Sequence, residues 1–272
     1  MSVTKKSQSG YIVVTGASSG IGRAIALDLA KRGQPLVLVA RREDRLRHLA
    51  DEIKKIAPVQ IVDLPTQIVV ADLLSEVGFE HLAKTVAHLP LAGLVNNAGV
   101  GDLRRFDLQS WDTQQNMMQL NMVSLTRLTS LLLPRMRAQG FGRILNVASV
   151  AAFQPGPYFA VYSATKAYVL SLSLALREEL KGTGVTVTVL CPGMTESEFH
   201  SHADTGRAKG LGVVAKASAE SVAAAGVEAM LCGRSKVVTG VVNKIMVMAN
   251  RFTSLKLSAA LASKVLKPQD KV

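Results

Sequence analysis

Short apolar runs alternate with longer amphipathic segments along most of this chain, and this alternation limits the possible folds more than any other feature. Residues 11–15 (YIVVT) and 35–40 (PLVLVA) have the length and the β-branched content of buried strands. Residues 21–32 have helical spacing and end at Gly33, a residue typical of helix C-termini. Buried strands separated by helices are typical of parallel sheets. The sequence therefore predicts an α/β fold, a doubly wound parallel sheet with helices on both faces.

The same pattern assigns a strand or a helix to most of the chain as far as residue 240. Strands are predicted at residues 11–15, 35–40, 91–95, 143–148, 185–190 and 236–240, with one or two more within 60–71. Helices are predicted at residues 21–32, 43–56, 75–88, 110–138, 158–181 and 218–232. No linker or internal repeat interrupts this region, so we expect a single domain over residues 1–240 and a C-terminal extension over 241–272.

The loop after the first strand is typical of a nucleotide-binding turn. Residues 16–22 (GASSGIG) place Gly16, Gly20 and Gly22 between a predicted strand and a predicted helix. Glycines at these positions let the backbone approach a pyrophosphate, and the helix directs its N-terminus at the phosphates. Ser18 and Ser19 add hydroxyl donors. Glycine-rich stretches are also common turns, but the strand before and the helix after favour dinucleotide binding.

Two arginines follow the second strand, at the place where an acidic residue would accept the ribose hydroxyls of NAD. Arg41 and Arg42 suit the 2′-phosphate of NADP instead, which an acid would repel. The alternative is a solvated pair of surface arginines. Asp72, at the end of the third predicted strand, could accept a hydrogen bond from an adenine amino group, and helix capping explains an aspartate there equally well.

Tyr162 and Lys166 lie four residues apart in a segment predicted to be helical, with Ser149 upstream. Residues at this spacing share one face of a helix, so the phenol and the ammonium should lie side by side. Tyrosine, with a usual pKa of about 10, is a poor acid–base catalyst at neutral pH, and a nearby cation lowers this pKa. The pair is therefore a candidate proton donor to a carbonyl. Alone, the pair is weak evidence for catalysis, because a tyrosine four residues before a lysine is common by chance.

Together these motifs resemble the short-chain dehydrogenase/reductases, over about residues 11–240. Thr15 and the glycine-rich loop are similar to the family's cofactor loop, residues 96–99 (NNAG) to its NNAG segment, and Pro192-Gly193 to the PG after its sixth strand. The resemblance implies a Rossmann fold and NADP, as NADPH, for the cofactor. The expected cofactor-binding residues are Gly16, Ser18, Ser19, Gly20, Ile21, Gly22, Arg41, Arg42, Asp72, Leu73, Asn97, Ala98, Gly99, Tyr162, Lys166, Pro192, Gly193, Thr195 and Ser197.

The family's catalytic tetrad matches Asn121, Ser149, Tyr162 and Lys166. By resemblance, Ser149 would hydrogen-bond a substrate carbonyl oxygen and Tyr162 would donate the proton as hydride arrives from the nicotinamide. Lys166 would lower the pKa of Tyr162 and hold the nicotinamide ribose. Asn121 would order a water beside Lys166 as a proton relay. These roles imply an NADPH-dependent oxidoreductase that reduces a carbonyl to an alcohol, or the reverse.

One position departs from the family pattern, in which a threonine often follows the PG by four residues and contacts the nicotinamide carboxamide. Ser197 takes that place here and keeps a hydroxyl, although Thr195 could serve instead. The loop that follows carries His200 and His202, but no cysteine or third histidine lies near them, so we predict no metal site.

The expected substrate pocket is largely apolar and favours a small hydrophobic carbonyl or alcohol compound. It draws on residues 100–103, on the loop after Met194, and on Phe153, Gln154, Pro157 and Tyr158. The alternative function is a non-catalytic NADP(H)-binding redox sensor or scaffold, since a fold does not fix a function. The intact tetrad favours the enzyme, and we expect a homodimer or homotetramer.

The positive charge of the chain is concentrated near its C-terminus. The net charge is +12, and from Arg234 onward there are eight basic residues and one acid, Asp270. Apolar residues between 245 and 266 recur at helical spacing, so the tail could pack on its own domain or a sister subunit, or lie on an anionic bilayer. With 4% aromatic residues and the excess positive charge concentrated at the tail, nucleic-acid binding is disfavoured.

Two further features bear on location. Cys191 and Cys232 are too few and too far apart to indicate a disulfide scaffold, which fits a reducing compartment. The basic N-terminus has no apolar run behind it, unlike a signal peptide, and no apolar stretch approaches the length of a membrane span. We therefore expect a cytoplasmic protein, with membrane association through the tail left open.

Overall fold

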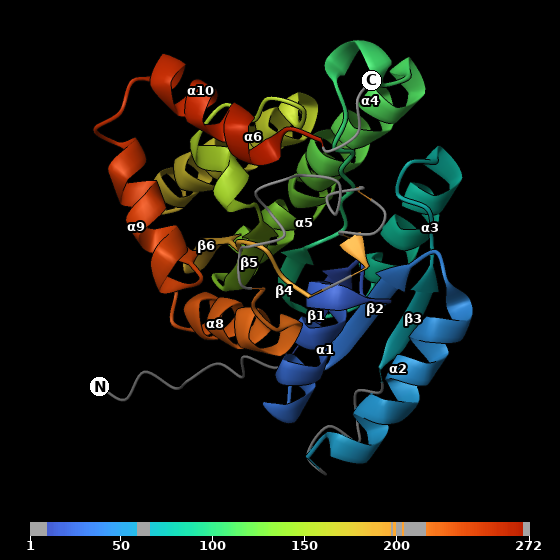
Figure 1. Ribbon diagram of the computed structural model, residues 1–272. Helices are drawn as coiled ribbons and strands as arrows, with labels where there is room; N and C mark the ends of the chain where they lie inside the picture. The colour runs from blue at the N-terminus through green and yellow to red at the C-terminus, as the bar shows by residue number, and fades with distance from the viewer. Residues whose placement is uncertain (1–9, 59–65, 197, 200–202, 204–215, 269–272) are drawn as a thin grey trace.

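Seven parallel strands form one central sheet in the computed structural model, which describes residues 10–58, 66–196, 198–199, 203 and 216–268 (Figure 1). The strand order is β3-β2-β1-β4-β5-β6-β7. The strands are β1 (Tyr11–Thr15), β2 (Leu36–Ala40), β3 (Gln67–Val70), β4 (Leu91–Asn96), β5 (Gly142–Val147), β6 (Val185–Cys191) and β7 (Lys236–Val238). The parallel α/β fold predicted from the alternating pattern is therefore confirmed.

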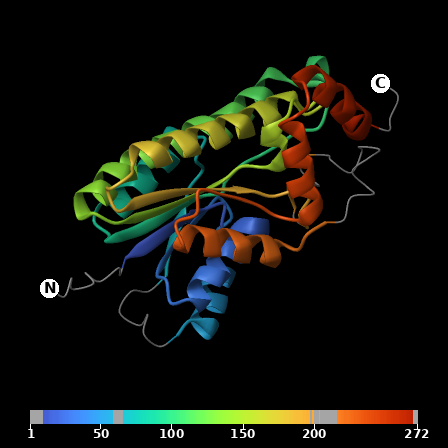
Figure 2. The same ribbon diagram turned by 90° about the vertical axis from the view of Figure 1, so that its left-hand side faces the viewer.

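Helices cover the sheet on both faces, and Figure 2 shows the two layers with the sheet between them. One layer consists of α1 (Gly20–Lys31), α2 (Glu43–Ile56) and α8 (Ala219–Leu231). The other contains α3 (Glu76–Ala87), α5 (Leu125–Gln139) and α6 (Ala160–Glu179), with α4 (Trp111–Met118) leading into α5. Short 3-10 turns lie at η2 (Phe106–Leu108) and η4 (Val150–Phe153).

Successive strand residues enter opposite cores, which is why the strands appear as unbroken apolar runs. In β1, Ile12 and Val14 pack with α1, α2 and α8, whereas Tyr11 and Val13 pack with α3 and α5. Side chains alternate between the faces of a strand, so a strand covered by helices on both sides must be apolar at every position. The two cores meet only through the sheet, and together they fix its register.

The order of connection reverses at β1, which pairs with β2 on one side and β4 on the other. The loops that leave β1 and β4 therefore turn toward opposite faces of the sheet. They open a crevice at the carboxyl ends of the strands, where doubly wound sheets bind ligands. The glycine-rich loop and the NNAG segment follow these two strands.

The long helix predicted at residues 110–138 is interrupted. Between α4 and α5 lies a π-helical segment, η3 (Gln119–Ser124), whose end is marked by a hydrogen bond of 3.0 Å from the Ser124 hydroxyl to the Gln119 carbonyl, five residues back. Apolar periodicity reports which face is buried and is insensitive to this change of backbone register. The segment predicted at 60–71 forms one strand, β3, and residues 59–65 lie outside the described part of the chain.

The C-terminal extension forms two helices, α9 (Val241–Asn250) and α10 (Leu255–Leu266), as its helical spacing predicted (Figure 1). The Ser254 hydroxyl caps α10 by accepting a hydrogen bond from the Leu257 amide at 3.3 Å. Val247, Ser258 and Ala262 are buried, but a series of apolar side chains points outward: Val241, Val242, Ile245, Met248, Phe252, Leu255, Leu257, Leu261 and Val265. Among the described residues, no helix is long and apolar enough to span a bilayer.

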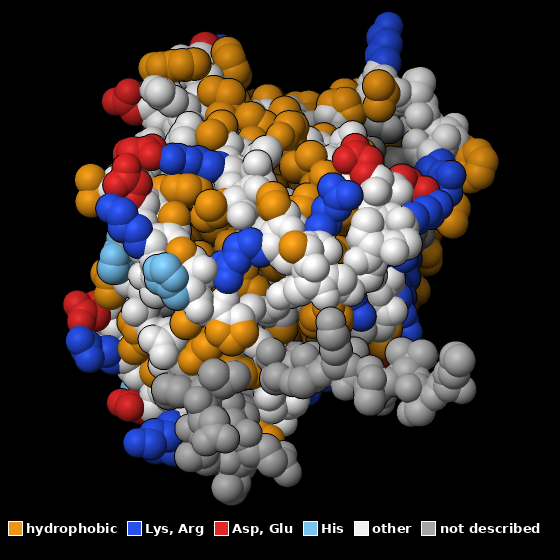
Figure 3. Space-filling view, turned by 180° about the vertical axis from the view of Figure 1, so that it is seen from behind, with side chains coloured by type: hydrophobic (Ala, Val, Ile, Leu, Met, Phe, Trp, Pro, Cys, Tyr) orange, Lys and Arg blue, Asp and Glu red, His pale blue; other side chains and the backbone are white. Residues whose placement is uncertain are grey.

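Charge is distributed unevenly over the molecule. On the face seen from behind in Figure 3, Lys and Arg side chains lie scattered among Asp, Glu and apolar side chains. By contrast, residues 241–268, which include α9 and α10, contain five Lys or Arg residues and no Asp or Glu. The two C-terminal helices therefore carry many exposed apolar side chains, and all their charged side chains are basic.

Candidate active site

A cavity of about 980 Å³ lies at the carboxyl ends of the strands, large enough for a dinucleotide portion and a small substrate. It brings together almost every site residue predicted from the sequence that the structure describes. Those lining it are Gly16, Ser18, Ser19, Gly20, Ile21, Arg41, Arg42, Asp72, Leu73, Asn97, Ala98, Gly99, Ser149, Tyr162, Lys166, Pro192, Gly193 and Thr195. Gly22 and Asn121 lie behind the lining, and Ser197 falls outside the described residues.

The glycine-rich loop is held against the loop that follows β4. The Asn97 side-chain amide donates hydrogen bonds to the carbonyls of Thr15 (3.0 Å) and Gly16 (3.2 Å). A Cβ atom on Gly22 would come within 2.3 Å of both Asn97 Nδ2 and the Gly16 carbonyl oxygen. Gly16 and Gly20 have φ angles of +65° and +53°, which favour glycine. The glycines therefore allow the loop to fold back tightly over Asn97.

The Thr15 hydroxyl joins the same two loops from the other side. It donates to the Val95 carbonyl at 3.2 Å and accepts hydrogen bonds from the amides of Asn97 (3.0 Å) and Ala98 (3.1 Å). Thr15 is buried, so its hydroxyl satisfies polar groups that water could not reach. This contact fixes the backbone at the point where the strand order reverses.

The N-terminus of α1 is not capped by the side chain of its N-cap residue. Ser19 is its N-cap residue, but the Ser19 side chain makes no capping hydrogen bond. In α3 and α8, by contrast, Ser75 and Ser218 accept from the amides of their own first turn. The first amides of α1 are therefore not held by a cap side chain, and they face a glycine-lined cavity, as a pyrophosphate site needs.

The two arginines after β2 differ in their surroundings. Arg42 Nη2 donates to the hydroxyls of Ser18 (3.1 Å) and Ser19 (2.9 Å), so this residue is built into the cofactor end of the cavity. The Arg41 side chain is 68% exposed and lies 3.9 Å from the Asp72 carboxylate. The alternative of two solvated surface arginines thus describes Arg41 better than Arg42.

An acid, Glu198, also lines this end of the cavity and pairs with a third arginine, Arg45, and neither was predicted from the sequence as a site residue. The Glu198 carboxylate accepts a hydrogen bond from Arg42 Nη1 at 2.9 Å and another from Arg45. These guanidinium groups, Arg45 first, hold the pKa of Glu198 below its usual range. Arg45 could have been found from the sequence, because residues three apart share one face of a helix and Arg45 lies three residues after Arg42, the N-cap residue of α2. Nothing local in the sequence indicates Glu198, because it follows β6.

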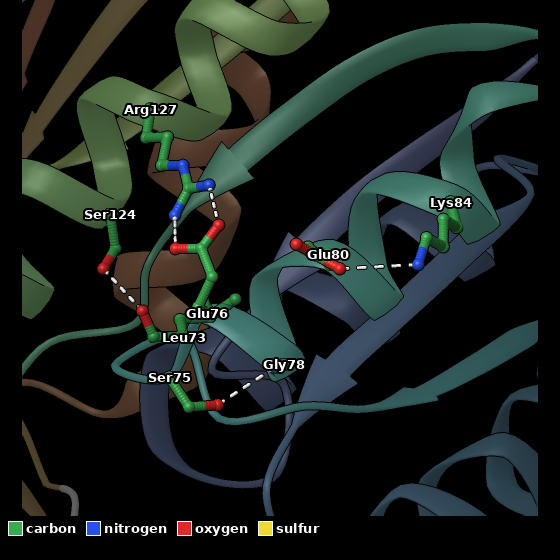
Figure 4. Close-up of polar contacts among 8 residues, drawn as sticks. All are labelled: Leu73, Ser75, Glu76, Gly78, Glu80, Lys84, Ser124 and Arg127. Carbon is green, nitrogen blue, oxygen red and sulfur yellow. Dashed lines mark hydrogen bonds and ion pairs between the residues drawn. The ribbon is translucent and has the colours of Figure 1, made fainter.

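The loop that carries Asp72 and Leu73 is fastened to α5, as Figure 4 shows. The Ser124 hydroxyl donates to the Leu73 carbonyl at 2.7 Å, and the Arg127 guanidinium forms a two-pronged ion pair with Glu76. This anchoring fixes the side of the cavity next to Asp72. It also gives the π-helical segment a function in the site, since Ser124 is its last residue.

Helix capping does not account for Asp72. The N-cap of α3 is Ser75, whose hydroxyl accepts from the Gly78 amide at 3.0 Å. Asp72 Oδ1 accepts from the Leu74 amide at 3.0 Å and so stabilises the turn before the helix. Its carboxylate remains part of the cavity wall.

Tyr162 and Lys166 lie one turn apart on α6, and both are almost completely buried, with 6% and 5% of their surface exposed. The Lys166 ammonium is 5.7 Å from the centre of the Tyr162 ring and donates to the Val147 carbonyl at 2.9 Å. Ser149, which follows β5, lines the same part of the cavity, and its side chain acts to lower the pKa of Tyr162. Phe159 stacks on Tyr162 with ring centres 4.2 Å apart. The predicted trio is therefore assembled in one apolar corner.

Burial dominates the ionisation of this pair. It raises the pKa of Tyr162 to about 12, against a smaller lowering by the hydrogen bond from Ser149, and it lowers the pKa of Lys166 to about 8. The pKa of Tyr162 is therefore raised overall and not lowered as expected, because desolvation of the phenolate is its largest cause. At neutral pH Tyr162 is a protonated phenol and Lys166 remains mostly charged.

Asn121 lies in the π-helical segment and braces the site from behind. Its Oδ1 accepts from the Val100 amide at 2.9 Å, and its Nδ2 donates to the Val100 carbonyl (2.9 Å) and the Thr165 hydroxyl (3.0 Å). A Cβ atom on Gly99 would come within 3.0 Å of Asn121 Oδ1 and 3.4 Å of Lys166 Nζ. Asn121 thus connects the NNAG segment to α6, next to the lysine.

The substrate end of the cavity only partly follows the prediction. Val100, Gly101, Gln154 and Met194 line it, but Phe153, Pro157 and Tyr158 do not. The prediction missed a wall of the cavity that is formed by α9, α10 and the turn between them. Its residues include Asn243, Met246, Asn250, Thr253, Leu261, Val265 and Leu266. Asn250 Nδ2 donates to Gln154 Oε1 at 2.6 Å and so joins α9 to the predicted pocket. The sequence predicted the helical spacing of the tail, but it did not indicate that the tail packs against the cavity.

Two other predictions concern residues near this wall. Thr195 is buried and its hydroxyl donates to the Gly193 carbonyl at 3.1 Å. His200 and His202 lie outside the described residues. Among the described residues there is no group of three or more His, Cys, Asp or Glu side chains arranged to hold a metal ion.

Comparison with known proteins adds three findings. A profile of the short chain dehydrogenase family matches residues 10–208. An uncharacterized oxidoreductase of Staphylococcus epidermidis is 36% identical over 202 residues, which is 73% of this chain and 84% of that protein. Human 17-beta-hydroxysteroid dehydrogenase type 3 is 34% identical over 74% of this chain and 64% of its own length.

A solved structure extends the likeness to nearly the whole fold. The short-chain dehydrogenase from Sphingobium yanoikuyae in complex with NADPH superposes with a TM-score of 0.78 and 27% identity. The match covers 96% of this chain and 98% of that one, so it includes the region of the C-terminal helices.

Proposed function

The chain belongs to the short-chain dehydrogenase family and is an oxidoreductase, and we propose that it is an NADPH-dependent reductase that converts an apolar carbonyl compound to an alcohol, or catalyses the reverse reaction. The observation that carries this proposal is the assembly of Ser149, Tyr162 and Lys166 in one buried corner of a cavity whose other end offers a glycine-rich loop and arginines. The two ends separate the chemistry from the binding of the nucleotide.

The proposed proton transfer rests on the ionisation of the buried pair. Bound NADPH would supply the hydride to the carbonyl carbon. Tyr162, a protonated phenol at neutral pH, would donate its proton to the carbonyl oxygen while Ser149 donates a hydrogen bond to the same oxygen. The charge of Lys166 would stabilise the phenolate that forms in this buried site. Asn121, which contacts the segment beside Lys166, would position the proton relay to solvent.

The preference for NADP over NAD is supported by the residues that follow β2. Arginines stand there, and no acid occupies the place that would accept the ribose hydroxyls of NAD. Arg42 and the hydroxyls of Ser18 and Ser19 form a cluster of hydrogen-bonding groups suited to a phosphate. The Sphingobium yanoikuyae neighbour holds NADPH. Asp72 and Leu73 would line the adenine, and Pro192, Gly193 and Thr195 or Ser197 the nicotinamide.

The apolar wall built by α9 and α10 supports a hydrophobic substrate. The relatives include an enzyme named for a hydroxysteroid, which is an apolar alcohol. Leu261 and Val265 both line the cavity and remain exposed on the surface, so the cavity opens beside an apolar outer face. A non-catalytic sensor is less well supported, because binding a nucleotide does not require a tyrosine and a lysine to be buried together.

We propose that the outer face of α9, α10 and the turn between them makes peripheral contact with acidic membranes. Its exposed apolar side chains, such as Phe252 and Leu255, lie on elements with cations and no acids. Such a composition suits an anionic bilayer, with apolar groups entering and lysines contacting headgroups. Copies of the chain would associate elsewhere, through apolar residues exposed on η3, α5 and α6, such as Val123, Leu131 and Leu174.

Replacing Tyr162 with Phe should remove the proton donor and little else. We expect the rate of carbonyl reduction, followed by loss of NADPH absorbance across a panel of ketones and aldehydes, to fall by at least about a hundredfold. NADPH affinity should change little, because the ring remains. Tyr168→Phe, on the exposed side of the same helix, is the matched control and should keep full activity. Activity of Tyr162→Phe within tenfold of the parent would contradict the proposed role.

Replacing Arg42 with Ala should reduce the discrimination between cofactors. The parent should bind NADPH more tightly than NADH, and the variant should lose about tenfold or more in NADPH affinity with NADH nearly unchanged, as expected for a charge-assisted contact. Arg47→Ala on the same helix, where Arg47 pairs with Glu43, should change neither dissociation constant. Equal affinities for the two cofactors in the parent would refute the proposed preference.

Membrane contact is testable by sedimentation with vesicles. The full chain should sediment with vesicles containing acidic phospholipid at low salt, less with neutral vesicles, and less as salt rises, since each basic residue contributes about 1 kcal/mol near such a surface. Phe252→Ser together with Leu255→Ser should reduce this binding while leaving reductase activity on a water-soluble substrate. A chain that ignores acidic vesicles at low salt would refute the proposal.

A further inference from the structure

A carboxylate of this chain lies among the groups that would bind the 2′-phosphate of NADP. Glu198 Oε2 accepts from Arg42 Nη1 at 2.9 Å, and Glu198 Oε1 accepts from Arg45. The same Arg42 donates through Nη2 to Ser18 and Ser19. Two guanidinium groups around one anion, with hydroxyls beside them, is the arrangement expected for a bound phosphate.

Glu198 reaches this place from a distant part of the sequence. It lies 156 residues from Arg42 and 153 from Arg45, in the segment after β6, and it lines the cavity together with Arg42. Arg45 pairs with Glu198 without lining the cavity itself. The neighbouring guanidinium groups hold its pKa below the usual range, so the side chain is an anion at neutral pH.

We propose that Glu198 is an internal competitor of the 2′-phosphate of NADP for Arg42 and Arg45. This inference rests on the proposed function, in which the cavity binds a nicotinamide dinucleotide. The phosphate can contact these guanidinium groups only when both ion pairs of Glu198 are broken, whereas NAD lacks the phosphate and leaves them intact. Glu198 therefore lowers the preference for NADP over NAD, and Arg45 becomes a contact of the phosphate.

The competition has a predictable direction. A phosphate monoester carries a charge of about −1.5 to −2 at neutral pH and has three acceptor oxygens, against −1 and two oxygens for a carboxylate. The phosphate should therefore displace Glu198. The gain in NADP affinity is smaller than it would be if the two arginines had no carboxylate partner to lose. The Glu198 side chain is 40% exposed, and ion pairs at such sites each shift an equilibrium by up to about fivefold.

The test is the replacement of Glu198 with Gln, which keeps the side-chain shape and removes the charge. We expect the dissociation constant for NADPH, measured from nucleotide fluorescence, to fall by about threefold to tenfold, and that for NADH to stay within about twofold. Adenosine 2′,5′-bisphosphate should gain in the same way as NADPH and adenosine 5′-monophosphate should not, which isolates the 2′-phosphate from the nicotinamide.

Two further variants make the result specific. Glu196→Gln removes an exposed charge two residues away and should leave the ratio of the two dissociation constants unchanged. Glu198→Ala should repeat the effect of the glutamine variant. Unchanged or weaker NADPH binding in both Glu198 variants, an equal gain for NADH, or the same gain in Glu196→Gln would overturn the competition. A parent chain that binds neither dinucleotide would overturn the proposed function as well.

Discussion

The burial of a lysine beside a tyrosine is the constraint on which the rest of the site depends. Removing an ammonium group from water is unfavourable, and here it is partly offset by the Val147 carbonyl, while the pKa of Lys166 falls to about 8. The same burial keeps Tyr162 protonated. A phenol that holds its proton until a nearby cation can stabilise the phenolate is suited to deliver that proton to a bound carbonyl oxygen. The fold must therefore hold this corner closed while leaving access from the cavity.

The sheet provides that rigidity at the point where its strand order reverses. Thr15 and Asn97 join the loops after β1 and β4 by hydrogen bonds of 3.0–3.2 Å, and Asn121 continues the connection to α6 through Val100 and Thr165. Every step in this path is a buried or part-buried hydrogen bond, so the nucleotide end and the proton-donating end share one framework. A shift of the glycine-rich loop would be transmitted to the segment beside Lys166.

Much of this arrangement could be predicted from the sequence, since unbroken apolar strands and glycine-ended helices require a two-layered parallel sheet. In such a sheet, motifs at the carboxyl ends of the strands, such as the glycine-rich loop, lie together at one edge of the sheet. The interruption at Gln119–Ser124 could not be predicted, because a π-helical register leaves the apolar spacing intact. Glu198 and the wall of α9 and α10 depend on contacts between distant segments, which local patterns do not record. The pKa of Tyr162 could not be predicted without knowing how deeply its side chain is buried. The spacing of Tyr162 and Lys166 alone suggested a lowered pKa, whereas burial raises it.

The central claim is that the charge on the buried Lys166 enables Tyr162 to give up its proton, and the pH dependence of reduction tests it most directly. Since the pKa of Lys166 is about 8 and that of Tyr162 about 12, both groups hold their protons at pH 6–7. The maximal rate of carbonyl reduction at saturating NADPH should be constant there and should fall as the pH rises through about 8, where the lysine loses its charge. A rate that stays level to pH 10, or that increases between pH 7 and 9, would contradict the account.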